Sequence, residues 1–147
     1  MLAYRRSAVL GESKGITYVT AEQLVSESDV ISLHCPLTEE TRGLVNESFL
    51  SSMKRGAYLI NTSRGAVIDE EALYRALVSG HLGGAALDVM AKEPPSADNP
   101  LLTLDSCLIT PHCAWTSVEA RSRLIAILSE NMRAFQATGQ GIHRVFG

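Results

Sequence analysis

The sequence lacks any stretch that is long and apolar enough to cross a bilayer. Its first residues contain neither a long apolar run nor a small-residue cleavage site, so they do not resemble a signal peptide. No basic tract stands out, and 13 basic and 16 acidic residues leave a net charge of −3. These absences predict a cytoplasmic protein with no membrane and no nucleic acid among its partners.

Cysteine is scarce as well. The three cysteines are Cys35, Cys107 and Cys113, and no two of them form a C-x-x-C pair. An odd number without that spacing argues against a disulfide framework and against structural zinc. We therefore expect reduced thiols and no metal site.

Apolar residues make up 46% of the 147-residue chain and charged residues 20%, which suits one globular domain with its own core. Short apolar runs alternate with helical stretches. We expect strands near 30–34, 57–61, 84–88 and 107–110, and a long last helix over 117–138. This alternation predicts an α/β fold: a Rossmann-like, doubly wound parallel sheet with helices on both faces.

Capping residues mark the expected helices. Asn46 and Asp69 precede two helical stretches and are suited to cap them. Thr116, with a glutamate three residues on, forms the capping-box pattern that opens the last helix. Gly80 and Gly139 follow the ends of the second and last of these helices.

Chemically active side chains follow the expected strands. Arg64 follows the second strand, Asp88 and then Glu93 follow the third, and His112 follows the fourth. Each of them alone is more often a surface charge, a helix cap or a packed residue. The carboxyl ends of parallel strands meet at one edge of a sheet, so four such groups indicate a site there.

These groups suit the reduction of a 2-keto acid. Hydride delivery to a carbonyl needs a proton donor for the oxygen, and a histidine such as His112 is suited to that task. Glu93 beside it would stabilise the imidazolium. Arg64 can hold a carboxylate through two parallel hydrogen bonds, and Asp88 is placed to contact a nicotinamide ring or its ribose.

Four segments carry a specific resemblance: Leu33–Thr38, Met53–Gly65, Ala86–Asp88 with its following Glu93–Pro95, and Thr110–His112. Their order and spacing resemble those of the D-isomer-specific 2-hydroxyacid dehydrogenases, over nearly the whole chain. Trp115 resembles the hydroxypyruvate reductase (glycerate dehydrogenase) branch and the related corepressors; alternatively it is an aromatic plug of the core.

The resemblance implies NAD as cofactor and a small 2-keto or 2-hydroxy acid as substrate. It implies that Arg64 binds the substrate, that His112 is the acid/base and that Glu93 supports His112. It also implies a cofactor groove, whose residues would be Cys35, Pro36, Thr41, Thr62, Ser63, Arg64, Asp88, His112 and Ala114.

The sequence departs from the family pattern in one respect. It contains no G-x-G-x-x-G, and Gly83-Gly84 precedes an expected strand rather than opening a helix. We therefore expect residues 1–147 to form a partial dinucleotide-binding domain that begins at the second strand, Leu2–Tyr4, without the glycine-rich loop and the substrate domain. An exposed sheet edge and apolar surface then predict a homodimer. The isolated chain is expected to be inactive.

Arg5 stands where the family has an acidic residue for the adenosine ribose. A basic residue there favours a 2′-phosphate, so NADP is an alternative cofactor; equally, Arg5 lies at a terminus and has no role. Two other functions also stay open. One is a dehydrogenase-like binding module of the corepressor type, and the other is a truncated product without activity.

Overall fold

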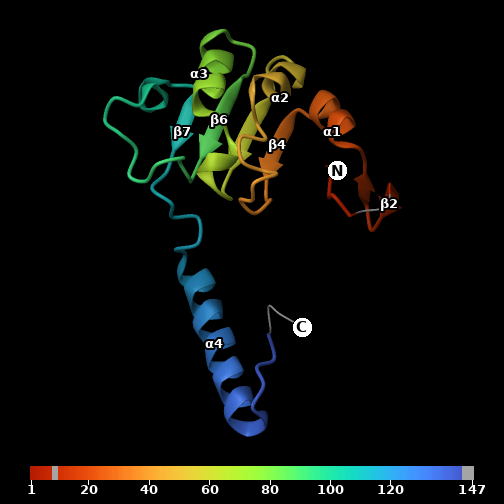
Figure 1. Cartoon of the computed structure of the whole chain (residues 1–147), viewed down its shortest axis with the longest axis vertical. Coiled ribbons are helices and arrows are strands. Elements are labelled where there is room, and N and C mark those ends of the chain that lie inside the picture. The colour runs from red at the N-terminus through yellow and green to blue at the C-terminus, as the bar shows by residue number, and fades with distance from the viewer. Residues whose placement is uncertain (8–9, 144–147) are drawn as a thin grey trace. The chain divides into compact units, whose positions relative to one another are not determined.

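The chain folds into two compact units, Met1–His112 and Cys113–Gly147 (Figure 1). The computed structural model describes residues 1–7 and 10–143.

The main sheet of the first unit has four strands in the order β4-β5-β6-β7, and each neighbouring pair is parallel. The strands are β4 (Val30–Leu33), β5 (Tyr58–Asn61), β6 (Gly84–Leu87) and β7 (Cys107–Ile109). Each is one residue shorter than expected. The α/β class and the Rossmann-like parallel sheet are confirmed.

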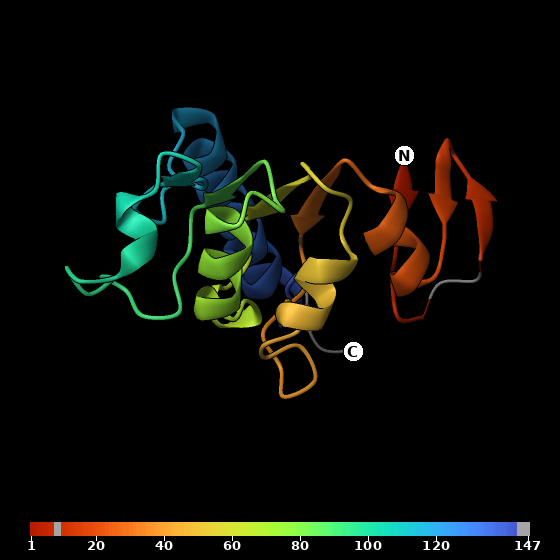
Figure 2. The ribbon, with the colours of Figure 1, turned by 90° about the horizontal axis from the view of Figure 1, so that it is seen from above.

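Two helices, α2 (Glu47–Ser52) and α3 (Glu70–Val78), lie in the connections between β4, β5 and β6. They contact each other and lie side by side in both views (Figure 2). Leu50 of α2, Leu59 of β5 and Leu73 of α3 are almost fully buried in one apolar cluster. This cluster is the core of the unit.

The strands alternate between buried and exposed side chains. On β4 and β5, Ile31 and Leu59 are buried, whereas their neighbours Val30 and Tyr58 are 53% and 52% exposed. Leu108 of β7 is exposed too. Among residues 1–7 and 10–143, β4 pairs with β5 alone, so exposed apolar surface and a free strand edge occur here, whereas the sequence had placed the free edge beside the second strand, Leu2–Tyr4.

The helix caps match the sequence. The Asn46 side chain accepts a hydrogen bond from the Phe49 N–H, and that of Asp69 accepts from the N–H groups of Glu71 and Ala72. Glu70 and Glu71 then lie in the first turn of α3, where the helix dipole favours negative charge. Two short 3₁₀ turns, η1 (Gly65–Val67) and η2 (Pro100–Thr103), complete the connections.

A small second sheet near the N-terminus was not expected. It has the order β1-β3-β2, with β1 (Leu2–Ala3) parallel to β3 (Ile16–Tyr18) and β2 (Gly11–Ser13) antiparallel to it. Lys14 and Gly15 form the two-residue hairpin loop, and both have positive φ, as a type I′ turn requires. A short helix, α1 (Ala21–Glu27), follows it.

The second unit contains one long helix, α4 (Val118–Thr138). Its N-cap is Ser117, whose side chain accepts from the Ala120 N–H, so the prediction of Thr116 as cap was one residue early. The Thr116 hydroxyl instead donates to the Cys113 carbonyl. Gly139 ends the helix at φ 70°, as expected. Within residues 1–7 and 10–143, no helix has the length and apolar character needed to span a membrane.

Candidate active site

Glu93 and His112 form a hydrogen-bonded pair beyond the carboxyl ends of β6 and β7. The Nδ1 atom of His112 lies 2.8 Å from Oε2 of Glu93, and the Met90 N–H donates to Oε1 of Glu93 at 3.0 Å. Both contacts lower the pKa of the Glu93 carboxyl, the His112 contact most strongly. The contact between Glu93 and His112 that the sequence predicted is therefore present, and it favours the ionised form of the carboxyl.

The backbone of His112 is itself unusual. Its φ is 53°, in the left-handed region that side chains with a Cβ rarely adopt. Its N–H donates to the Thr110 carbonyl at 3.0 Å. Strained backbone of this kind occurs preferentially at functional positions, where the surrounding structure compensates for the cost.

Asp88 is a buried carboxylate at the end of β6, with 5% of its surface exposed. The Thr110 hydroxyl donates to its Oδ1 at 2.6 Å, and the Asp88 N–H donates to the Asn61 carbonyl. The ends of β5, β6 and β7 therefore fix this carboxylate together.

The turn that carries Arg64 is built around Asn61, which is fully buried. The Asn61 amide nitrogen donates to the Arg64 carbonyl at 3.0 Å, and its oxygen accepts from the N–H and hydroxyl of Ser63. The Arg64 guanidinium donates to the Ser63 carbonyl at 2.7 Å and is exposed. A rigid turn therefore presents an accessible cation.

This turn and the end of β4 enclose a hollow of about 510 Å³. Its lining combines hydroxyls, an imidazole and a guanidinium with an apolar wall, and consists of His34, Cys35, Pro36, Leu37, Thr62, Ser63 and Arg64. Five of the nine predicted cofactor residues are among them. This mixture of polar and apolar residues fits a nicotinamide nucleotide or a small keto acid.

Close backbone contact joins the Arg64 turn to the Glu93 loop. A Cβ atom on Gly65 would lie 1.9 Å from the Met90 carbonyl carbon and 2.1 Å from its oxygen. Only glycine leaves room for this approach. The two loops are therefore placed relative to each other by direct contact of their backbones.

Comparison with known proteins identifies the family of this chain. The profile of the family described as D-isomer specific 2-hydroxyacid dehydrogenase, NAD binding domain, matches residues 1–114. The chain belongs to this family. The description names the NAD-binding domain of 2-hydroxyacid dehydrogenases, the family that the sequence motifs resemble.

Two relatives and one solved structure illustrate the similarity. The chain is 50% identical over 122 residues to a glyoxylate reductase of Korarchaeum cryptofilum, covering 83% of this chain and 37% of that protein. It is 45% identical over 133 residues to a hydroxypyruvate reductase of Blautia hydrogenotrophica, covering 90% and 41%. The crystal structure of a glyoxylate reductase from Paecilomyes thermophila superposes with a TM-score of 0.88 at 33% identity, covering 99% and 44%. The chain thus spans well under half the length of each.

The remaining predicted residues of this dehydrogenase domain occupy different places. Thr41 shapes the loop after β4 and is not among the lining of the 510 Å³ hollow: its hydroxyl donates to the Pro36 carbonyl at 2.7 Å and accepts from the Thr38 N–H. Ala114 and Trp115 belong to the second unit. Trp115 is 56% exposed, so it is not a plug of the core.

Sequence reasoning missed two residues of the site. His34 lines the hollow, and its Nε2 lies 2.9 Å from the Ser32 hydroxyl. Thr110 orients Asp88. His34 lies in the Leu33–Thr38 motif and Thr110 in the Thr110–His112 motif. Their position beside the expected residues could therefore have indicated a role.

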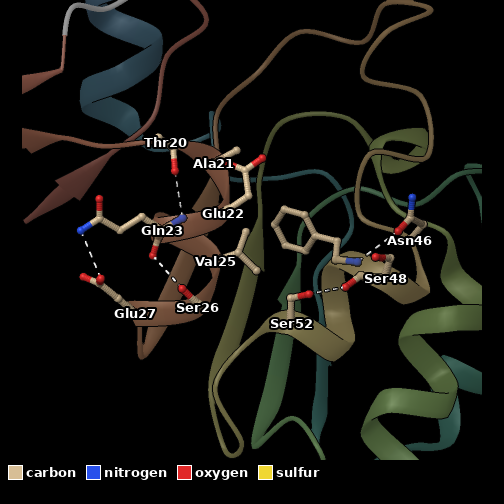
Figure 3. A pocket seen from close by; sticks show the side chains of 11 residues that line it. Thr20, Ala21, Glu22, Gln23, Val25, Ser26, Glu27, Asn46, Ser48 and Ser52 are labelled. Atoms are coloured by element: carbon tan, nitrogen blue, oxygen red, sulfur yellow. Dashed lines mark hydrogen bonds between the residues drawn. The ribbon is translucent and has the colours of Figure 1, made fainter.

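A second hollow, about 690 Å³, lies between α1 and α2 (Figure 3). Its polar groups mostly bond to each other or to nearby backbone: Thr20 accepts from the Gln23 N–H, and Gln23 donates to Glu27. None of the predicted site residues lines it. Although it is larger, five of the predicted site residues, Arg64 among them, line the first hollow, so we place the site at the sheet edge. Across the described ranges, no three His, Cys, Asp or Glu side chains gather as metal ligands would.

Proposed function

We propose that this chain provides the acid–base pair, the substrate-binding arginine and part of the cofactor groove of a D-2-hydroxyacid dehydrogenase. The 2.8 Å contact between Glu93 and His112 carries the proposal. Because Nδ1 of His112 faces the carboxylate, Nε2 is the nitrogen that exchanges a proton with the substrate oxygen. Glu93 stabilises the imidazolium when His112 is protonated.

Arg64 is proposed to bind the substrate carboxylate. Its exposed guanidinium stands on the rigid Asn61 turn at the rim of the hollow. A guanidinium can donate two parallel hydrogen bonds to a carboxylate, which fixes the carbonyl carbon in position. Glyoxylate and hydroxypyruvate each carry such a carboxylate beside the carbonyl group.

Cys35, Pro36, Thr62 and Ser63 are proposed to line the nicotinamide side of the cofactor groove, with Asp88 at its inner end. A bound nicotinamide supplies or accepts the hydride. Thr41 supports the groove through its bond to Pro36. Ala114 stays a prediction of the family resemblance.

NADP is proposed as an alternative to NAD because of Arg5. Its guanidinium carbon lies 6.0 Å from the centre of the Tyr18 ring, a cation–π distance that holds the arginine near the end of β1. Arg5→Asp should lower the preference for NADPH over NADH. An unchanged preference would contradict any role for Arg5.

The sharpest test places these residues in a complete enzyme. Residues 1–112 would replace the equivalent segment of the Korarchaeum glyoxylate reductase, which is 50% identical to this chain. We expect the hybrid to reduce glyoxylate or hydroxypyruvate with NADH or NADPH. His112→Ala should lower kcat by about a hundredfold or more while leaving cofactor affinity nearly intact.

Arg64→Lys should mainly raise KM, because a lysine cannot form the paired bonds. Arg75→Lys is a matched control, since Arg75 is bonded to Glu71 and Glu47 on the surface. A folded hybrid that binds cofactor but has no activity would overturn the proposal and favour the binding-module function.

The 147-residue chain itself is expected to bind NADH and NADPH weakly and to lack useful turnover, because no glycine-rich loop presents N–H groups to the pyrophosphate. Calorimetric titration measures the affinity. A micromolar dissociation constant, or turnover of about one per second, would contradict this.

Self-association as a homodimer is also proposed. The edge of β4, which no strand pairs with in the part of the chain that the structure describes, and the exposed Val30 and Tyr58 support it. Light scattering should show a dimer, and Val30→Lys should shift it toward monomer. A monomeric wild-type chain at high concentration would contradict the proposal.

A cytoplasmic location is proposed from the odd number of cysteines.

A further inference from the structure

The loop that carries Glu93 is held at both ends by a single side chain of α3. Oε1 of Glu70 accepts a hydrogen bond from the Ala91 N–H at 2.6 Å, and Oε2 accepts from the Asn99 amide at 2.8 Å. Ala91 lies just before Glu93, and Asn99 lies at the far end of the loop. Glu70 thus holds the two ends of the loop together.

The Asn99 amide can bond to Glu70 through its nitrogen but not through its oxygen. Its Oδ1 already accepts from the Leu101 N–H at 3.0 Å as the cap of η2, which leaves Nδ2 to face Glu70. The orientation of the Asn99 amide is therefore fixed by the backbone. The contact requires an acceptor at position 70.

The connection from Glu70 to the acid–base pair is short. Ala91 is bonded to Glu70, the preceding Met90 N–H is bonded to Glu93, and Glu93 is bonded to His112. On its other side the Met90 carbonyl touches Gly65. A shift of the Ala91 peptide would therefore move the donor that holds Oε1 of Glu93.

We propose that Glu70 is a positioning residue for the Glu93 and His112 pair, acting through its hydrogen bonds to Ala91 and Asn99. The importance of this role for catalysis rests on the function proposed above. The geometric claim does not, because the contact between Glu93 and His112 can be measured without substrate. Glu70 touches neither substrate nor cofactor in this arrangement.

The decisive variants are Glu70→Gln, Asn99→Asp and the two combined. Glu70→Gln keeps the size of the side chain but turns its amide donor toward the amide donor of Asn99. In the double variant the glutamine donates to the new aspartate, which still accepts from Leu101, so the bonding pattern is restored. Glu71→Gln is the matched control, since Glu71 has the same charge in the same helical turn but its carboxylate bonds to Arg75 and not to the Glu93 loop within the described residues.

The readout is the titration of the Glu93 carboxyl by ¹³C NMR in the 147-residue chain, with urea unfolding to verify the fold. In the wild type the pKa of Glu93 is lowered by His112 and the Met90 N–H; Asp88 is the charged group that opposes this. Removing the negative charge of Glu70 would by itself lower that pKa further. A rise in Glu70→Gln therefore reports loss of the His112 and Met90 contacts, not loss of charge.

We expect the Glu93 pKa to rise in Glu70→Gln, to return toward the wild-type value in the double variant, and to stay unchanged in Glu71→Gln. In the hybrid enzyme kcat should follow the same order, falling on the order of tenfold or more in Glu70→Gln. An unchanged Glu93 titration in folded Glu70→Gln, or no recovery in the double variant, would overturn the proposal. An inactive hybrid whose Glu93 titration responds as expected would overturn only the proposed function.

Discussion

Helices α3 and α4 begin in the same way but differ in what they bury. Each has a capping side chain, Asp69 or Ser117, and a glutamate in its first turn. The nine residues of α3 bury Ala72, Leu73 and Leu77, whereas none of the 21 residues of α4 is buried. Caps and spacing therefore define where a helix forms, but burial of its apolar face depends on a tertiary partner.

The same contrast holds for function. Helix α3 packs on the main sheet and its first residue reaches the Glu93 loop. Helix α4 exposes a row of large apolar side chains, namely Val118, Leu124, Ile125, Ile127, Leu128, Met132 and Phe135. Mutations should therefore act very differently in the two helices.

The largest expected difference is in core packing. Leu73→Ala removes a fully buried side chain and should lower the free energy of unfolding by about 2–5 kcal/mol. Leu128 is 57% exposed, so Leu128→Ala should change the free energy of unfolding by no more than about 0.5 kcal/mol. Urea unfolding followed by circular dichroism measures both. Similar losses for the two variants would mean that α4 is buried in solution.

Gly65→Ala should have the next largest effect. The new Cβ would overlap the Met90 carbonyl, and relieving that overlap should cost about 1–3 kcal/mol of stability. It should also separate the Arg64 turn from the Glu93 loop, so the Glu93 carboxyl should titrate closer to its ordinary pKa.

Gly141→Ala is the control in the second unit. Its Cβ would meet only the end of the Asn131 side chain, at 3.3 Å, which can move aside. A wild-type stability for Gly65→Ala would show that the two loops are not in the contact described.

Sequence patterns identified the four main strands, the Asn46 and Asp69 caps and the pairing of Glu93 with His112, because each depends on local spacing or on the rule that strand ends share an edge. The hairpin of β2 and β3 was missed because its strands are three residues long and β2 is polar. The role of Glu70 was also missed. A glutamate in the first turn of a helix is explained by the helix dipole alone, and its bonds to Ala91 and Asn99 join positions 21 and 29 residues away.

A smaller difference is expected between the helix caps. Asp69→Ala should cost about 1 kcal/mol of global stability, since two N–H groups of α3 lose their acceptor. Asp69→Asn keeps an acceptor oxygen and should cost less. Ser117→Ala should lower the helical circular dichroism signal of α4 without changing the main unfolding transition. If Ser117→Ala lowered global stability more than Asp69→Ala, the first turn of α3 would not unfold together with the core.

The smallest effect is expected from a change of pH. It should differ between two glutamate–histidine pairs. Glu93 lies 2.8 Å from His112, whereas Glu130 in α4 lies 3.4 Å from His143, with both of those side chains more than half exposed. Such exposed pairs contribute little to stability because water screens them. Glu130→Gln should therefore unfold as the wild type does at every pH.

Glu93→Gln should differ from the wild type in a pH-dependent way. The fold lowers the pKa of Glu93 below its ordinary value of 4.5, chiefly through His112 and then through the Met90 N–H. A carboxyl whose pKa is lower in the folded state stabilises the fold above its unfolded pKa, and that contribution is lost as the pH falls through the folded value. The stability difference between wild type and Glu93→Gln should thus be constant above about pH 5 to 6 and shrink below pH 4.5. Urea unfolding from pH 7 to pH 3 measures it. A difference that grows as the pH falls would mean that Glu93 is held in its protonated form, and the pair would then be unable to stabilise an imidazolium.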